Sequence, residues 1–268
     1  MDATYQVTST QLTRNVVGLV EGSDPVLKNT YVMYGAHLDH VGTAIDNAGR
    51  GRVNNPIETD RIWNGADDDG SGSAAMIGIA KTFAAGPRPK RSTVFVWHAG
   101  EEAGLYGSLY NADFPAVPID KVVAQLNIDM IGRDRDDDPR YANTLFVIGA
   151  DRISTDLHNT VVKTNDAEKK PLTLDFEYND PADPEAFYYR SDHFSYAAKD
   201  VPIAFFFTGT HPDYHANSDS VEKIHFDKLT RIAQMVYQAG FNIANNSVAP
   251  VKDHLGPRAG KGFSGLIK

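Results

Sequence analysis

The chain has 268 residues, of which 41% are hydrophobic, so it is long enough for one sizeable domain with a single core. Its formal net charge is −9 and no block of Lys and Arg gathers in it, which argues against nucleic acid or an anionic membrane as a partner. The absence of cysteine excludes disulfide bonds and thiolate ligands, so any metal ion must be held by His, Asp and Glu.

The distribution of apolar residues along the chain bears on its location and on its domain organisation. No apolar run approaches the roughly 18 residues of a membrane span, and the first residues lack the basic and apolar regions of a signal peptide. We therefore expect a chain that is soluble as it stands. Residues 1–245 are predicted to form a single domain, and residues 246–268 a polar, Gly-rich and poorly ordered tail.

The first predicted strands lead to a pair of potential ligands. Residues 4–9 alternate like an edge strand, and residues 15–21 are its expected partner. A short apolar strand over 31–35 is followed by His37 and Asp39. A strand that ends in His-x-Asp suits a metal site, because the carboxylate can accept the second N–H of the imidazole. A purely structural histidine at the end of a strand remains the alternative.

A long loop and a triple aspartate come next. Residues 43–63 show no periodicity, and long loops of this kind tend to form functional rims or lids. Asp67, Asp68 and Asp69 then precede a helix predicted over 73–83. These aspartates could cap the helix and compensate its dipole, or they could offer a carboxylate to a metal ion. The second interpretation is favoured because one acid would suffice for a cap.

Two adjacent glutamates follow the most apolar strand of the chain. This strand, predicted over 93–97, stops just before Glu101 and Glu102. Ligands of open α/β sheets sit at the carboxyl ends of strands, and neighbouring side chains point in different directions. One glutamate can therefore hold a metal ion while the other faces a substrate. Stabilisation of a helix that starts near Leu105 is the structural alternative.

The rest of the chain completes an α/β pattern. A buried strand over 122–128 ends at Asp129, and a charged residue there is costly unless it is paired or metal-bound. His215 lies in the loop after the last predicted strand. The later strands are expected over 144–148, 172–178 and 201–207, and the later helices over 151–163, 191–198 and 227–244. This alternation predicts three layers, helix–sheet–helix, with a mixed and mainly parallel central sheet and antiparallel additions at the first two strands.

All candidate residues share one location, at the C-terminal end of a predicted strand or in the loop behind it. They are His37, Asp68, Glu101, Glu102, Asp129 and His215. Two histidines and three carboxylates form a natural ligand set for two ions that share one carboxylate, and zinc suits imidazole and oxygen ligands. The sixth residue, an acid, is then left for proton transfer. Two such ions can deprotonate a shared water and polarise a carbonyl.

Five segments, in order, resemble the motif regions of the co-catalytic zinc aminopeptidases, whose relatives include secreted bacterial leucyl aminopeptidases and glutamate carboxypeptidase II. They are GAHLDHVG, NGADDDGSGSAAM, HAGEEAGLYGS, NIDMIGRD and DYHANSDS, and they are distributed over most of residues 13–240. Five ordered motifs are highly specific, whereas any one of them would be weak evidence. The resemblance implies a zinc exopeptidase fold, two Zn²⁺ per chain and a secreted or periplasmic location.

The resemblance also implies a ligand set for each ion. His37 and Asp129 would bind one zinc, and Glu102 and His215 the other. Asp68 would be the bridging carboxylate, because the segment that it starts fits the family pattern Asp-x-x-Ser/Ala-Gly.

Other residues receive roles around these ligands. Glu101 would take a proton from the water that bridges the two zinc ions and deliver it to the leaving amine. Asp39 matches the family's partner of the first histidine, and Tyr214 matches a phenol that stabilises the oxyanion in some relatives. Asp219 is expected to support His215. Local hydrogen bonding is expected for His40, His98 and His211, and helix capping or lining of the cleft for Asp192 and His193.

The predicted activity is that of a metallo-aminopeptidase acting on peptides with a free N-terminus. One alternative is a glutaminyl cyclase-like enzyme, which uses a single zinc and cyclises its substrate; metal stoichiometry separates the two. Another is a non-catalytic, receptor-like module of the same fold. Such modules lose ligands, whereas this chain keeps five candidate ligands together with Glu101.

Overall fold

A computed structural model describes residues 12–45 and 51–256. Its main strands are β1 (Val16–Val20), β2 (Tyr31–His37), β5 (Ser92–His98), β6 (Val122–Ile128), β7 (Thr144–Ile148), β8 (Thr173–Asp175) and β9 (Ile203–Phe207). A small separate sheet contains β3 (Gly42–Thr43) and β4 (Ile62–Trp63). The helices are α1 (Gly70–Ala85), α2 (Tyr106–Asp113), α3 (Ala150–Ile153), α4 (Thr155–Asp166), α5 (His193–Ala197) and α6 (Phe226–Asn245).

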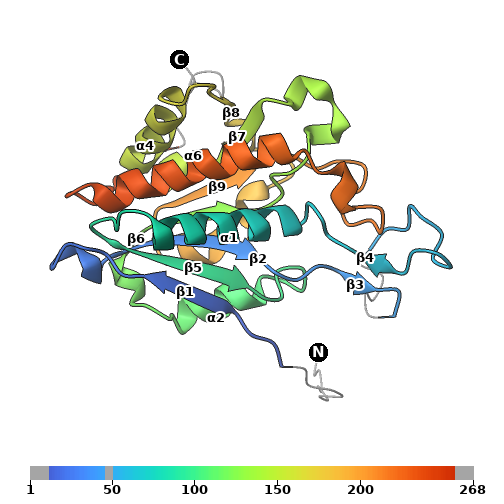
Figure 1. The fold of residues 1–268 in the computed structure, drawn as a ribbon, viewed down its shortest axis with the longest axis horizontal. Coiled ribbons are helices and arrows are strands. Elements are labelled where there is room, and N and C mark those ends of the chain that lie inside the picture. The colour runs from blue at the N-terminus through green and yellow to red at the C-terminus, as the bar shows by residue number, and fades with distance from the viewer. Residues whose placement is uncertain (1–11, 46–50, 257–268) are drawn as a thin grey trace.

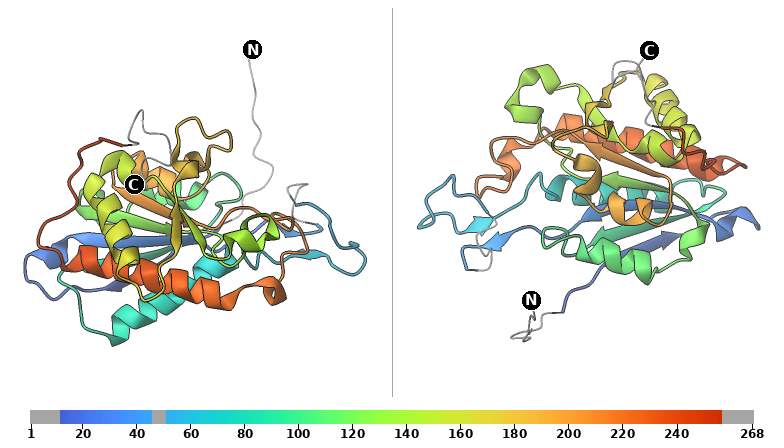
Figure 2. Two further views of the ribbon diagram at one scale, coloured as in Figure 1. Left: turned by 90° about the horizontal axis from the view of Figure 1, so that it is seen from above. Right: turned by 180° about the vertical axis from the view of Figure 1, so that it is seen from behind.

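The predicted three-layer α/β architecture is confirmed (Figure 1). Within the described ranges, the central sheet has the strand order β1-β5-β2-β6-β9-β7-β8. Helices α1, α4 and α6 cover one face of this sheet, and α2 and α5 lie on the other, as the view from behind in Figure 2 shows. Strands β5, β2, β6 and β9 run parallel to one another, so their carboxyl ends lie along one edge.

The structure differs from the expected elements in three places. β1 is antiparallel, as expected, and pairs with β5, but β7 is also antiparallel to β9, which was not predicted. The strand expected over residues 4–9 lies outside the described residues. The strand expected over 172–178 ends early, at Asp175. The helix expected over 151–163 is divided into α3 and α4 at Ser154, whose hydroxyl accepts a hydrogen bond from the Leu157 N–H and caps the second helix.

Alternate side chains of β2 pack against the helices on the two faces of the sheet. Val32 and Tyr34 belong to a hydrophobic cluster that includes residues of α1 and α6, whereas Met33 belongs to a cluster with residues of α2 and α5. Successive side chains of a strand point to opposite faces, so an uninterrupted apolar run is what a strand covered on both sides requires. The strand then ends at His37, which it holds rigidly at the edge of the sheet.

Gly240 of α6 provides a test of how tightly this layer packs. A Cβ atom at Gly240 would lie 1.8 Å from the hydroxyl oxygen of the fully buried Tyr34. We expect Gly240→Ala to lower the free energy of unfolding by about 1–3 kcal/mol, because overpacking a fixed core outweighs the better helix propensity of alanine. Urea unfolding measures the change. Gly78→Ala in α1 is the control: a Cβ there meets nothing within 4 Å, and we expect stabilisation of about 0.5–1 kcal/mol. Equal changes in the free energy of unfolding of the two variants would contradict the close packing at Gly240.

The residues that follow α6 pack back against the helical layer. The carboxylate of Asp253 accepts a hydrogen bond from the Thr155 N–H, and the His254 N–H donates to the Ile153 carbonyl. The described part of the predicted tail, 246–256, is thus tied to the start of α4. Across residues 12–45 and 51–256, no helix combines the length and apolar character needed to cross a bilayer.

Candidate metal centre

The six candidate residues gather at the edge where the parallel strands end. His37 closes β2, Glu101 and Glu102 follow β5, and Asp129 follows β6. Asp68 precedes α1, and His215 lies in the loop after β9. Contacts between their side chains, given below, connect these segments, which are far apart in the sequence. The site therefore depends on the sheet register, which brings these strand ends together.

The first group of potential ligands consists of His37, Asp68 and Asp129. The Nε2 atom of His37 lies 3.2 Å from Asp68 Oδ1 and 3.6 Å from Asp129 Oδ1. All three side chains are buried, and one ligand atom of each lies within 4.8 Å of the others. His37 Nε2 has no hydrogen-bond partner among the described residues. A buried nitrogen without a partner beside two carboxylates fits a cation between them.

The second group contains Asp68 again, with Glu102 and His215. The Nε2 atom of His215 lies 3.2 Å from Asp68 Oδ2 and 3.0 Å from Glu102 Oε2. The two oxygens of Asp68 thus face two different groups. Although burial raises it, the hydrogen bonds from His215 and His37 hold the pKa of Asp68 well below its usual range. Asp68 is therefore an ionised carboxylate between two sets of ligand atoms.

Asp39 supports this centre in a way that the sequence did not indicate. The Nδ1 atom of His37 contacts the main-chain carbonyl of Asp39 at 2.9 Å, whereas the Asp39 carboxylate is 4.0 Å away. That carboxylate accepts hydrogen bonds from the N–H groups of Glu101, at 3.1 Å, and Glu102, at 3.3 Å. The main chain at Asp39 thus orients the His37 ring so that Nε2 points inward. Its side chain fixes the backbone of both glutamates.

Glu101 lines the same pocket but belongs to neither ligand group. The pocket also includes Asp68, Asp129 and His215. Burial raises the pKa of the Glu101 carboxyl well above its usual value, and the charge of Asp129 adds to this, while His37 opposes it. A carboxyl group with a raised pKa exchanges protons closer to neutral pH, which suits general acid–base chemistry.

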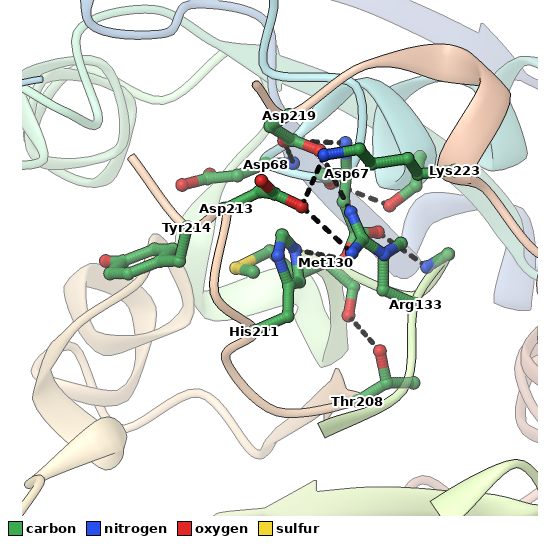
Figure 3. A network of polar contacts seen from close by, with 12 residues as sticks. Asp67, Asp68, Met130, Arg133, Thr208, His211, Asp213, Tyr214, Asp219 and Lys223 are labelled. Carbon is green, nitrogen blue, oxygen red and sulfur yellow. Dashed lines mark hydrogen bonds and ion pairs between the residues drawn. The ribbon is translucent and has the colours of Figure 1, made fainter. Parts of the chain in front are cut away.

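The three consecutive aspartates have three different roles. Asp69 is the N-cap of α1, because its Oδ1 accepts from the Gly72 N–H at 3.0 Å. Asp68 points into the centre, and Asp67 points away from it, into a buried network (Figure 3). Both sequence interpretations of this segment thus apply, each to a different residue.

This buried network joins the Asp68 segment to the loop that carries His215 (Figure 3). Asp67 accepts from the Gly132 N–H at 2.6 Å, and its Oδ2 lies 3.2 Å from His211 Nε2. Asp219 accepts from the N–H groups of Asp67, at 3.0 Å, and Asp68, at 3.2 Å. Asp219 was expected to support His215. It holds the backbone of Asp67 and Asp68 instead.

Arg133 and Asp213 are members of this network that sequence reasoning missed. The Nη2 atom of Arg133 donates to Asp213 Oδ2 at 3.1 Å, and Lys223 Nζ donates to the same oxygen at 2.8 Å. Arg133 is 3% exposed, which is rare for an arginine and requires paired carboxylates. Both residues lie inside recognised motifs, but their partners come from loops that the sequence does not place.

The capping role expected for Asp192 is wrong. Asp192 does occupy the N-cap position of α5, but its side chain makes no capping hydrogen bond within the described part of the chain. The carboxylate turns inward, where its Oδ2 lies 3.2 Å from Nδ1 of the fully buried His98. His98 also contacts the Tyr196 hydroxyl at 2.7 Å, and His193 Nε2 contacts the Tyr188 carbonyl at 2.8 Å. A buried histidine without a polar partner would cost free energy. The contact of Asp192 with His98 therefore replaces the capping hydrogen bond that Asp192 could have made to α5.

The predicted rim loop over 43–63 and a second loop over 179–190 both reach the pocket region. Phe187 and Arg190, from residues 179–190, line the pocket beside Tyr214. The Arg190 Nη2 donates to the Tyr214 hydroxyl at 3.3 Å. Arg52, from residues 43–63, donates through Nε to the main-chain carbonyl of Tyr214 at 3.0 Å. Both loops therefore fix the residue that immediately precedes His215.

Comparison with known proteins places this arrangement among peptidases. Residues 15–240 match the family model described as Peptidase family M28. Leucine aminopeptidase 2 of Trichophyton equinum is 31% identical over 216 residues, which are 78% of this chain and 37% of that protein. The chain thus spans little more than a third of this curated relative.

Solved structures share the fold. The LapA aminopeptidase of Legionella pneumophila matches with a TM-score of 0.66 and 25% identity, over 87% of this chain and 55% of that one. Glutaminyl cyclase of Porphyromonas gingivalis matches with a TM-score of 0.63 and 17% identity, over 84% of this chain and 76% of that one. At the latter identity the similarity concerns the fold, so the chemistry must be argued from the site.

Proposed function

Because this chain belongs to peptidase family M28, we propose that it is a zinc-dependent aminopeptidase that removes the N-terminal residue of peptides. The observation that carries the proposal is the Asp68 carboxylate, whose two oxygens face separate groups of potential ligands. A single cation would need one such group. Two groups that share one carboxylate suit two cations side by side.

The donor atoms fit zinc. His37 and Asp129 would hold one ion, Glu102 and His215 the other, and Asp68 both. Imidazole nitrogens and carboxylate oxygens are ordinary zinc ligands, and the chain has no thiolate to offer. When bound, two zinc ions would lower the pKa of water and polarise the scissile carbonyl.

The residues of the chain itself would supply proton transfer and oxyanion binding. Glu101 would accept a proton from the attacking water and donate it to the leaving amine, because it lines the same pocket without belonging to either ligand group. The Tyr214 hydroxyl would donate a hydrogen bond to the negatively charged oxygen of the tetrahedral intermediate. Arg190 already donates to this hydroxyl oxygen, which leaves the phenolic proton for the substrate. Burial raises the pKa of Tyr214, which keeps that proton in place.

The pocket offers apolar contacts to the side chain at the N-terminal position of the substrate. Met130, Phe187, Phe205 and Phe207 supply the apolar part of its lining, beside seven polar or charged residues. Contact with these four residues would remove apolar substrate surface from water, which contributes about 25 cal/mol per Å². The acidic centre would attract the free amine of the peptide.

A glutaminyl cyclase activity is the second candidate, because the glutaminyl cyclase of Porphyromonas gingivalis has the same fold. Both ligand groups are complete in this chain, which favours the two-ion hydrolase. The receptor-like alternative is disfavoured for the same reason.

Digestion of a defined peptide mixture, followed by mass spectrometry, tests the proposal. We expect zinc-loaded protein to shorten free peptides by one residue from the N-terminus and to leave N-acetylated copies intact, because the acetyl group removes the charged amine. Removal of the ions with a chelator should abolish the activity, and added zinc should restore it. Shortening from the C-terminus would contradict the proposal, and loss of ammonia from N-terminal glutamine would support the cyclase.

A further inference from the structure

His40 lies at the second ligand group, although the sequence suggested only a local hydrogen-bonding role for it. Its Nδ1 atom is 2.7 Å from Glu102 Oε1 and 3.9 Å from Asp68 Oδ2. The side chain is 8% exposed, and His40, Asp68 and Glu102 each offer a ligand atom within 4.8 Å of the others. The ring meets that of His215 edge-on, with centroids 5.7 Å apart.

The close approach of His40 to Glu102 is not an aligned hydrogen bond. Within the part of the chain that the structure describes, both ring nitrogens of His40 and the Oε1 atom of Glu102 are buried without a hydrogen-bond partner. His37 Nε2 shows the same pattern beside Asp68 and Asp129. The His40 nitrogen and the Glu102 oxygen are thus close together, buried and without the polar partner that each needs. That geometry suits a shared cation.

The distances can be compared with those of a zinc coordination sphere. Zinc bonds of about 2.0–2.1 Å in tetrahedral geometry place neighbouring ligand atoms roughly 3.3 Å apart. The contacts of His40 Nδ1 with Glu102 and Asp68, at 2.7 and 3.9 Å, lie on either side of this value. The contacts of His215 Nε2 with the same two carboxylates are 3.0 and 3.2 Å.

Gly65 makes room for the His40 ring. A Cβ atom at Gly65 would lie 2.6 Å from His40 Cγ, so any other residue would displace the ring. The φ angle of Gly65 is +59°, a conformation that glycine adopts at little cost. The backbone three residues before Asp68 is thus shaped around His40, which holds the ring against Glu102.

We propose that His40 is a ligand of the metal ion that Glu102 and His215 hold. The inference rests on the proposed two-zinc centre and extends it. This ion would have ligand atoms from His40, Asp68, Glu102 and His215. The other ion would have them from His37, Asp68 and Asp129 and keep a more open position. The ion with more protein ligands binds more tightly and is the last to be removed by a chelator.

Stepwise metal binding to His40→Ala tests the inference. The metal-free protein is titrated with zinc in competition with a chromogenic chelator. We expect the unaltered protein to bind two ions with unequal affinity. His40→Ala should weaken the tighter site by at least about 10-fold and leave the other unchanged. His254→Ala is the matched control. That histidine is 54% exposed, and its ion-pair partner is Asp200, which belongs to neither ligand group. Circular dichroism of each variant checks the fold.

X-ray absorption of the zinc-loaded protein separates ligation from a hydrogen-bonding role. If His40 is a ligand, the spectrum of the unaltered protein requires three imidazoles over two ions, and that of His40→Ala requires two. His40→Gln keeps a donor but lacks the imidazole, so it should behave like His40→Ala. Two imidazoles in the unaltered protein, or normal affinity in His40→Gln, would overturn the inference while leaving the two-zinc proposal intact. An unaltered protein that binds a single ion would overturn the two-zinc proposal, and the imidazole count at that ion would then decide on His40.

Discussion

Glu101→Gln is expected to lower kcat by about 10²- to 10⁴-fold while the protein keeps its metal ions. Glutamine has the same shape as glutamate but cannot accept a proton from water. Glu101 belongs to neither ligand group, so the substitution should not disturb the ligand atoms. Because the lost interaction acts in the transition state, kcat and kcat/KM should fall together and KM should change little.

Steady-state kinetics on a chromogenic leucine amide and elemental analysis of the same samples measure both parts of this result. Glu58→Gln is the matched control, since Glu58 is exposed in the 43–63 loop. Turnover that survives in Glu101→Gln would show that another group transfers the proton. A loss of activity that follows a loss of zinc would instead assign Glu101 to the ligands.

The fold was predictable where a strand is covered on both sides. The apolar runs of β2, β5 and β6 are continuous, as parallel strands between helical layers require. The direction of β7 was not recognised, because a strand pattern carries no direction. The antiparallel direction of β7 follows from its connection to β6. Residues 129–143 contain no α-helix that would return the chain to the opposite edge of the sheet, so β7 starts at the edge where β6 ends.

The candidate residues were predictable because parallel strands deliver their carboxyl ends to the same edge. This places His37 and Asp129 near each other whatever the loops do. The roles of Asp39 and Arg133 were not predictable, because their partners depend on how loops fold over the edge. His40 shows the same limit: its position directly after Asp39 says nothing of the direction of its ring.

Asp68→Asn is expected to remove both zinc ions and with them all measurable peptidase activity. An amide carries no charge, and its nitrogen cannot act as a ligand, so it cannot bridge two cations as a carboxylate can. The side chain is 5% exposed and asparagine has nearly the same volume, so the fold should persist. Without the ions, the substitution also removes the charge that the hydrogen bonds from His215 and His37 stabilise, so the metal-free variant should be less stable than the metal-free parent.

Thermal unfolding with and without zinc gives a reading independent of activity. Zinc at 100 times its Kd stabilises the folded state by about 2.7 kcal/mol for each site, so the parent should gain several degrees in Tm. Asp68→Asn should gain none.

Asp67→Asn distinguishes the bridging residue from its neighbour. Asp67 is equally buried and lies next in the chain, but its carboxylate contacts Gly132 and His211 and no residue of either ligand group. We expect this variant to lose stability, because a buried hydrogen-bonded charge is removed from the network around Arg133, and to keep two ions. If Asp67→Asn released the zinc and Asp68→Asn retained it, the alignment of the motif would be shifted by one residue, and the two-ion geometry derived from Asp68 would be wrong.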